Sequence, residues 1–218
     1  MKKKIKFIQV SCDGGAATGK STGAKMLAKK YNLKFLSSGM LYRYASYLII
    51  KYKPKNKLKF LSNNFKSLNY NHLKKIDLHT QQISQQSSII AKNNEIRKIL
   101  KKFQINFAIK YKNCCIEGRD ISTKILPKSD IKFYFVCNLT IAAKRRCHEL
   151  KKQDPKIKLQ NVKKALRIRN YLDTYRKHSP LLKHRNSVEI DTGKLNKQAM
   201  LRKMSKYVEK VLIKKYGN

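Results

Sequence analysis

The strongest constraint on the fold is a glycine-rich run near the start of the chain. It fits the pattern G-x-x-x-x-G-K-[ST] and consists of Gly14, Gly15, Ala16, Ala17, Thr18, Gly19, Lys20 and Ser21. The apolar run Ile5–Ser11 precedes it and predicts a strand, and a helical pattern over Lys20–Lys30 follows it. This strand–loop–helix context makes the pattern specific for phosphate binding. Backbone N–H groups of such a loop and the helix N-terminus form a nest for β- and γ-phosphates.

Three side chains at the end of the run have predicted roles in this nest. Lys20 supplies a positive charge that can follow a moving phosphoryl group. The hydroxyl of Ser21 can bind Mg²⁺, and Thr22 places a second hydroxyl nearby. We therefore predict an ATP site formed by Gly14–Thr22. Such a loop identifies a phosphate site but not a reaction, so the acceptor must be inferred from the rest of the chain.

Beyond the loop, short β-rich runs alternate with helical stretches, which is typical of a parallel α/β sheet. Strands are predicted over Ile5–Ser11, Phe35–Ser37, Cys114–Glu117, Ile131–Val136 and Val188–Asp191. Helices are predicted over Lys20–Lys30, Met40–Lys51, Gln81–Lys92, Ile96–Lys110, Ile141–Lys151, Val162–Asp173 and Lys197–Lys215. The segment Lys53–Lys75 is irregular and rich in Lys and Asn, so it is assigned no element. The expected fold is a three-layer α/β domain with a parallel five-stranded sheet flanked by helices.

The chain carries a large excess of positive charge. Its 52 Lys and Arg against 12 Asp and Glu give a net charge of +40 over 218 residues. Such a field attracts nucleotides, and it predicts non-specific binding of RNA or other polyanions at low salt. The Lys residues are spread along the whole chain without the sequence motif of an RNA-binding domain. An AT-rich genome would produce this Lys, Asn and Ile content, so we expect no specific nucleic-acid partner.

Cysteine and apolar patterns exclude several other classes of protein. The five cysteines form no C-x-x-C pair, and the histidines show no metal-ligand spacing, so we expect reduced thiols and no structural metal. No apolar stretch is long enough to span a bilayer. The first apolar run is broken by Lys6 and Gln9, which favours a strand over a signal peptide. We expect a monomer in the cytoplasm, with no membrane partner.

Further motifs follow the phosphate loop in a fixed order. Ser38-Gly39-Met40-Leu41-Tyr42-Arg43 comes first, and Glu117-Gly118-Arg119-Asp120 ends the third predicted strand. Arg169, Asp173 and Arg176 then show the spacing R-x-x-x-D-x-x-R, followed by Pro180-Leu181 and Ile190-Asp191-Thr192. In this order the segments resemble bacterial cytidylate kinase, from roughly residue 5 to residue 192. The resemblance implies a P-loop kinase that transfers the γ-phosphoryl group of ATP to CMP or dCMP in pyrimidine nucleotide metabolism. The products would be ADP and CDP or dCDP.

The resemblance also implies which residues serve the donor and the transfer. Catalytic residues would be Lys20, Arg119, Arg176 and two lid arginines that close over ATP, Arg145 and Arg146. Mg²⁺ would be bound together with ATP by Ser21, and Glu117 could reach it through a water molecule.

On the acceptor side, the resemblance implies three groups of residues. The phosphate of CMP would be held by Arg43, Arg119 and Arg176. The cytosine edge would be read by Ser88, Arg97 and Asp120, and the ribose would be held by Arg169 and Asp173. Ser38 and Tyr42 would line the pocket.

The chemistry of the reaction agrees with these residue types independently. Two polyanions must approach each other, so several bidentate arginines are needed to offset their repulsion. A carboxylate such as Asp120 can accept from the N4 amino group of cytosine, while its O2 and N3 require a donor such as Arg97. Seven of the chain's ten arginines lie at matched positions. Arg169 and Asp173 lie at i and i+4 of one predicted helix, and Arg176 at i+7 is expected to continue that face.

The chain departs from the pattern of the family at several matched positions. Ala17 stands where the family usually has the central Gly of the loop, and Gly15 stands where the family usually has Pro. Ala17 must therefore adopt whatever backbone conformation the nest requires, at some energetic cost. Glu117 stands where Asp is usual, and the segment after Arg169, which begins with Asn170, is less acidic than in the family.

By analogy with the family, the single kinase domain has three parts. The core comprises residues 1–37, 113–143 and 175–218, the monophosphate-binding part residues 38–112, and a mobile lid residues 144–165. One alternative is another small P-loop kinase, such as adenylate, uridylate or shikimate kinase, which would share the loop but lack the combination of later motifs. A second alternative is a basic RNA-binding protein on a degenerate kinase fold.

Overall fold

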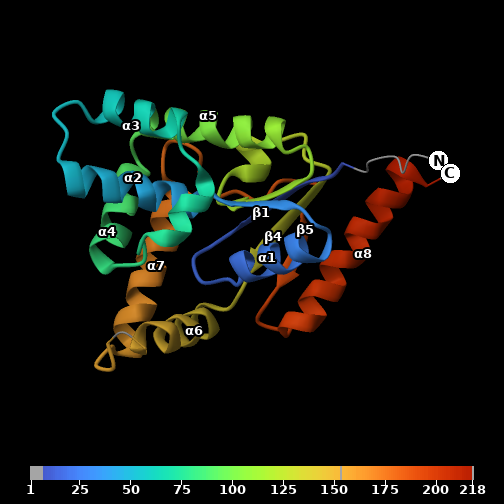
Figure 1. Cartoon of the computed structure of the whole chain (residues 1–218). Coiled ribbons are helices and arrows are strands. Elements are labelled where there is room, and N and C mark those ends of the chain that lie inside the picture. Colours follow the sequence, from blue (N-terminus) through green and yellow to red (C-terminus); the bar gives the residue numbers. More distant parts are fainter. Residues whose placement is uncertain (1–6, 153, 218) are drawn as a thin grey trace. The chain divides into compact units, whose positions relative to one another are not determined.

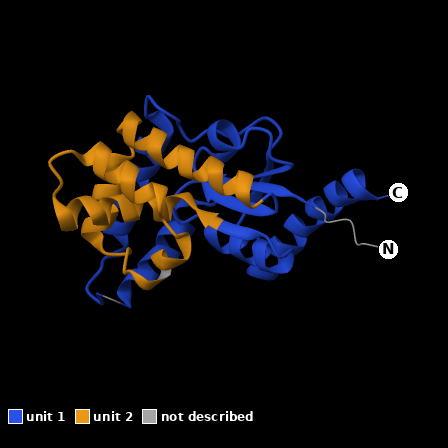
Figure 2. Cartoon of the chain, turned by 45° about the horizontal axis from the view of Figure 1, so that its top comes forward, with its two compact units in different colours: residues 1–35, 112–218 blue, residues 36–111 orange. Residues whose placement is uncertain are grey.

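The computed structural model describes residues 7–152 and 154–217. They belong to two compact units, which Figure 2 shows in different colours. The first unit consists of residues 1–35 and 112–218, and the second of residues 36–111. The second unit is therefore one continuous segment inserted into the sequence of the first.

A five-stranded sheet is the framework of the fold (Figure 1). Its strands are β1 (Gln9–Gly14), β2 (Lys34–Ser37), β3 (Cys114–Gly118), β4 (Ile131–Val136) and β5 (Val188–Asp191). Their order across the sheet is β2-β3-β1-β4-β5, and β1 pairs in parallel with both β3 and β4. This arrangement confirms the predicted parallel five-stranded sheet with flanking helices. Since parallel strands end at one edge, the segments after β1, β3 and β5 emerge together, where ligands bind in α/β folds.

The helices of the first unit follow the prediction closely. They are α1 (Lys20–Lys30), α6 (Leu139–Lys151), α7 (Leu159–Tyr175) and α8 (Lys197–Tyr216), with a short π-helix, η2 (Ile121–Ile125). Strand β1 extends to Gly14, beyond the predicted end at Ser11, because Asp13 and Gly14 still pair with Tyr134 and Phe135 of β4. The first two residues of the predicted strand, 5 and 6, lie outside the described residues, and the prediction was wrong for Phe7 and Ile8, which precede the start of β1 at Gln9.

The second unit is helical. It contains α2 (Ser38–Tyr52), α3 (Lys57–Lys66), the 3₁₀-helix η1 (Tyr70–Lys75), α4 (Gln81–Ile90) and α5 (Asn94–Lys110). Helix α3 and η1 lie in the segment to which the sequence assigned no element. The Asn56 side chain caps α3 by accepting from the Lys59 N–H at 3.0 Å, and Leu61 and Phe65 are buried one turn apart. The cap and this i, i+4 spacing were signals that the high Lys content obscured.

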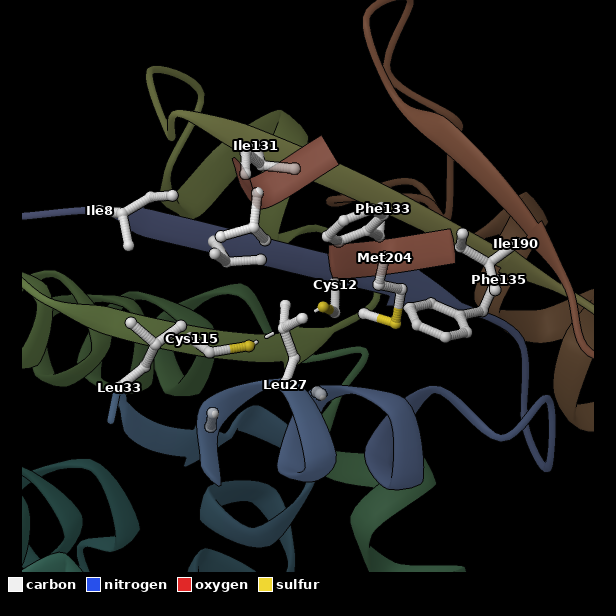
Figure 3. Packing of buried hydrophobic residues seen from close by; sticks show 14 of the residues in the cluster. Ile8, Cys12, Leu27, Leu33, Cys115, Ile131, Phe133, Phe135, Ile190 and Met204 are labelled. Atoms are coloured by element: carbon white, nitrogen blue, oxygen red, sulfur yellow. Dashed lines mark hydrogen bonds between the residues drawn. The ribbon is translucent and has the colours of Figure 1, made fainter. Parts of the chain in front are cut away.

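The core of the first unit lies between the sheet and the pair α1 and α8 (Figure 3). Phe133, Phe135 and Leu27 are almost fully buried there, and each such side chain contributes about 1.5–3 kcal/mol by leaving water. The Sγ atoms of Cys12 and Cys115 lie 3.9 Å apart within it. Burial raises the pKa of the Cys12 thiol well above its ordinary value, so this thiol stays protonated at neutral pH.

Among the helices of the described ranges, none combines the length and apolarity needed to cross a lipid bilayer.

Candidate active site

The phosphate loop starts at the end of β1, where Gly14 pairs with Phe135 of β4. A Cβ at Gly14 would lie 2.5 Å from the carbonyl oxygen of Phe135, so no other residue fits there. At the other end of the loop, Gly19 has a φ of 77° and immediately precedes α1. The two glycines therefore turn the chain from the sheet edge into the helix, and Lys20 becomes the first residue of α1.

Ala17, which replaces the usual loop glycine, has a φ of 57°. Left-handed backbone of this kind costs a residue with a Cβ about 1–2 kcal/mol. The loop thus keeps a left-handed backbone at this position, and Ala17 carries the energetic cost. We predicted this cost from the departure from the family pattern.

Side chains from distant elements hold the loop in place. Thr192, which follows β5, donates from Oγ1 to the carbonyl oxygen of Thr18 at 2.8 Å. Arg145 of α6 in turn donates to Oγ1 and the carbonyl oxygen of Thr192, at 3.1 and 2.7 Å. Arg146, the second predicted lid arginine, instead pairs with Glu149 of the same helix at 3.0 Å. The structure therefore links Arg145, but not Arg146, to the loop through the contacts described.

Lys20 and Glu117 form a buried ion pair beside the loop. Their Nζ and Oε2 atoms are 3.3 Å apart, and both side chains are almost inaccessible. Burial and the nearby charge of Arg119 lower the pKa of Lys20 to about 8, although the Glu117 carboxylate opposes this shift. The ammonium group thus lies in a site of low dielectric, where its electrostatic attraction for an anion is stronger than in water.

Asp173 brings two predicted phosphate-binding arginines together. Its Oδ2 accepts from Nε of Arg119 at 2.8 Å, and its Oδ1 accepts from Nη1 of Arg176 at 3.3 Å. Burial by itself would raise the pKa of Asp173, but the charges of Arg119, Arg169 and Arg176 and the Arg119 hydrogen bond keep it below its ordinary value. The carboxylate therefore stays ionised and orients both guanidinium groups.

The expectation that Arg176 continues the helical face of Asp173 is wrong. Helix α7 ends at Tyr175, and Arg176 has extended backbone with φ −66° and ψ 142°. The chain turns there, and Nε of Arg176 donates to the carbonyl oxygen of Ser179 at 2.6 Å. Pro180 disfavours right-handed helical backbone at Ser179, which precedes it and has a φ of 51°, so the helix cannot continue through this segment. This turn brings Arg176 back to Asp173 by a route that helical spacing does not describe.

Asp13 is a site residue that the sequence reasoning missed. It is fully buried at the end of β1 and accepts from the N–H groups of Ile121 and Ser122 at 2.8 and 2.7 Å and from Oγ of Ser122 at 2.5 Å. Burial raises the pKa of Asp13 to about 6 in spite of these hydrogen bonds. The residue fixes η2, which follows Arg119 and Asp120 directly. A lone acidic residue in an apolar strand, in a chain poor in acids, was the available signal.

The second unit contains the remaining predicted acceptor residues. The guanidinium of Arg97 lies 5.5 Å from the ring centroid of Tyr42, and its Nη1 donates to the carbonyl oxygen of Ala91 at 3.1 Å. Arg43 donates to the carbonyl oxygen of Leu78 and to Oγ of Ser84, both at 2.8 Å. The structure thus brings Tyr42 and Arg97 together. It places Ser88 on α4, where its hydroxyl donates to the carbonyl oxygen of Ser84, and Ser38 at the buried start of α2.

In the first unit, the glycine-rich loop with its buried lysine follows β1, and Arg119 follows β3. The register places these segments together, because Asp13 of β1 pairs with Gly118 of β3. Asp173 of α7 then joins Arg119 to Arg176. Cationic groups arranged around a phosphate nest can neutralise two phosphates that approach each other. The fold and this site define the class of P-loop kinases that act on small molecules.

Comparison with known proteins identifies the family within this class. The family model described as cytidylate kinase matches residues 10–210. The cytidylate kinase of Clostridium tetani is 34% identical, covering 96% of this chain and 97% of that protein. That of Bartonella tribocorum is 32% identical, covering 95% and 97%. The chain belongs to the cytidylate kinase family.

Solved structures support the fold alone. A shikimate kinase from Bacteroides thetaiotaomicron shares 10% sequence identity with a TM-score of 0.53, covering 94% of this chain and 99% of that one. An uncharacterized protein from Eubacterium ventriosum shares 17% identity with a TM-score of 0.57 over the same shares of the two chains. Such low identity carries no information about the substrate.

Proposed function

We propose that this protein transfers the γ-phosphoryl group of ATP to CMP or dCMP, giving ADP and CDP or dCDP. Membership in the cytidylate kinase family supports this activity, and the buried Lys20 beside the phosphate loop is the observation that carries it at the site. We also propose that it acts as a monomer in the cytoplasm, where both nucleotides are available.

The acceptor phosphate needs no general base in this proposal. Its oxygen is already a nucleophile at neutral pH, so positioning and charge neutralisation carry most of the rate. Lys20 would follow the transferred group, while Arg119 and Arg176, oriented by Asp173, would bind the acceptor phosphate. Asp120 would accept from the cytosine amino group; it is buried and directly precedes η2, so the Asp13 contacts fix its backbone.

The residues near Lys20 fit a Mg²⁺ ion bound with ATP. The half-buried Ser21 hydroxyl and the Glu117 carboxylate, 3.3 Å from Lys20, are oxygen donors of the kind that Mg²⁺ prefers. When bound, the ion would neutralise charge on the β- and γ-phosphates. We propose that Ser21 binds it directly and that Glu117 reaches it through water.

Each unit carries part of the residue set proposed for the acceptor. Arg119, Asp120, Arg169, Asp173 and Arg176 belong to the first unit, and Ser38, Tyr42, Arg43, Ser88 and Arg97 to the second. We propose residues 38–112 as the monophosphate-binding part, residues 144–165 as the lid, and residues 1–37, 113–143 and 175–218 as the core. Lid closure would exclude water and suppress ATP hydrolysis.

A turnover assay with ATP and Mg²⁺ against CMP, dCMP, UMP, AMP and shikimate tests the proposal. We expect CMP and dCMP to be the best acceptors. Lys20→Ala should lower kcat at least about a thousandfold, as loss of a charge-stabilising group does. Efficient phosphorylation of AMP or shikimate, but not of CMP, would assign the chain to another kinase activity. Normal turnover by Lys20→Ala would remove the loop from the reaction.

A further inference from the structure

Asn170 makes a contact that the proposed reaction leaves unexplained. It lies on α7 between Arg169 and Asp173, and its Oδ1 accepts from the backbone N–H of Ala16 at 2.9 Å. Ala16 belongs to the phosphate loop and is separated from Asn170 by 154 residues in sequence. A side chain of α7 thus binds the backbone of the donor loop directly.

Gly15 makes this approach possible. A Cβ at Gly15 would lie 3.1 Å from Oδ1 of Asn170, closer than side chains normally pack, and 3.4 Å from its Cγ and Nδ2. Unlike Gly14 and Gly19, Gly15 does not have a positive φ, so its backbone conformation is open to any residue. The lack of a side chain at this position serves the contact with Asn170 and not the turn of the loop.

The side chain of Ala16 strengthens the same link. It is 5% exposed and packs in an apolar cluster with Ala142, Ala143 and Cys147 of α6 and Val162 and Leu166 of α7. Ala16 is therefore attached twice to the hairpin of α6 and α7, once through its methyl group and once through its N–H. Because the site is partly shielded from water, the hydrogen bond competes less with solvent than an exposed one would.

We propose that Asn170 is a positioning residue for phosphoryl transfer, which locks α7 to the phosphate loop. This inference rests on the proposed function. Helix α7 carries Asp173, which orients Arg119 and Arg176, so the Asn170 contact sets these acceptor-side groups in register with the donor loop. A misplacement of about 1 Å can cost about a hundredfold in rate, so one such link can matter for turnover.

The central test compares Asn170→Ala, which lacks the amide, with a matched control variant. Asn161 lies on the same helix but is exposed, so Asn161→Ala tests a change of α7 away from the loop. We expect Asn170→Ala to lower kcat about tenfold or more while the Kd for ATP changes less than about threefold, and Asn161→Ala to change neither. Asn170→Asp retains an acceptor for the Ala16 N–H and should keep kcat within about threefold of the parent. Equal losses in Asn170→Ala and Asn170→Asp would overturn the proposal.

Gly15→Ala offers an independent way to break the same contact. Its Cβ would lie 3.1 Å from Oδ1 of Asn170, so that the amide must shift by a few tenths of an ångström and the hydrogen bond to Ala16 should weaken. The double variant with Asn170→Ala should then be little worse than the more impaired single variant. Losses that multiply in the double variant would show that the two residues act separately and would refute the link.

Amide hydrogen exchange distinguishes failure of this proposal from failure of the proposed function, because it needs no turnover. We expect faster exchange at the Ala16 amide in Asn170→Ala and no change in Asn161→Ala. Unchanged exchange would show that the hydrogen bond does not protect the loop. Faster exchange with an unchanged kcat would refute the positioning role. Absence of CMP phosphorylation by the parent protein would instead refute the proposed function.

Discussion

At the scale of single residues, Ala17 shows a local cost that the phosphate loop tolerates. Its φ of 57° is a conformation in which only glycine avoids steric strain. The neighbouring Ala16 is different, because its methyl group is buried among α6 and α7 and its φ is not positive, whereas Ala17 is only partly buried against the same cluster. The Cβ of Ala17 therefore destabilises the loop conformation, whereas the Cβ of Ala16 stabilises the fold through packing.

This contrast predicts opposite effects of glycine at the two positions. Ala17→Gly should raise the free energy of unfolding by about 0.5–1 kcal/mol, since relief of strain exceeds the added entropy of the unfolded chain. Ala16→Gly should lower it by about 1 kcal/mol through lost packing and added entropy. Urea denaturation of both variants gives the comparison. Destabilisation by Ala17→Gly would show that the left-handed conformation carries no strain.

The depressed pKa of Lys20 predicts an alkaline limit to activity. Lys20 is charged below a pKa of about 8 and neutral above it, so its attraction for phosphate is lost as the pH rises. We expect kcat/KM for ATP to fall above about pH 8, since this ratio reports ionisation of the free enzyme.

Lys20→Arg is the control for this pH profile. Arginine keeps its charge throughout the accessible range, so the variant should lose activity overall but should not show the fall near pH 8. The same alkaline fall in both proteins would assign it to a different group.

The contacts of Asp173 predict how it serves the acceptor. Both carboxylate oxygens accept from arginines, Arg119 and Arg176, so Asp173 should act mainly by orienting them. Asp173→Asn should raise KM for CMP about tenfold or more and leave KM for ATP nearly unchanged. The penalties should be equal for CMP and dCMP. A larger penalty for CMP would show that Asp173 contacts the ribose 2′-hydroxyl and would support the ribose-binding role that the family resemblance implies.

At the scale of elements, the short π-helix η2 depends on a residue outside itself. Its first two N–H groups donate to Asp13 of β1, so the end of one strand fixes the segment that follows its neighbour β3. Buried N–H groups left without an acceptor cost about 1–3 kcal/mol each.

A graded series of variants tests this dependence. Asp13→Ala should lower the free energy of unfolding by about 2–4 kcal/mol, because it removes the acceptor from both N–H groups. Asp13→Asn keeps one acceptor oxygen and should lose less. Ser122→Ala removes only the hydroxyl contact and should cost about 1 kcal/mol. Thermal or urea unfolding measures the series, and equal losses in all three variants would contradict it.

At the scale of the whole molecule, the dominant property is the net charge of +40. Like charges repel one another in the compact state, and dissolved salt screens this repulsion. We expect the Tm to rise as NaCl increases from about 0.02 to 0.5 M, with the same rise in choline chloride. Sulfate and phosphate are unsuitable here, because they can bind the phosphate loop and stabilise the protein by ligation. A Tm that stays constant or falls as the chloride concentration rises would show that charge repulsion does not destabilise the fold.

The same charge predicts non-specific RNA binding that is separate from the kinase activity. Lys20→Ala separates the two properties, since it should abolish phosphoryl transfer while leaving non-specific RNA retention nearly unchanged. RNA retention should fall steeply with salt in both proteins.

The sequence by itself determined the parallel sheet, the phosphate loop and the family. These follow from local rules: the glycine spacing of the loop, the alternation of strands and helices, and ordered motifs such as Glu117–Asp120. Helix α1 and strands β4 and β5 have the predicted bounds, because the residues that specify each element, the loop glycine before α1 and the apolar residues of each strand, lie within a few positions of each other.

Only the tertiary structure decided how distant residues serve the site. Arg176 returns to Asp173 through a turn, Asp13 holds η2, and Asn170 reaches Ala16. The Asp13 and Asn170 contacts each join residues more than a hundred positions apart. Spacing along one helix or strand cannot specify such pairs, because they depend on strand order and on how helices pack against the loop. The residue types were visible in the sequence, but their partners were not.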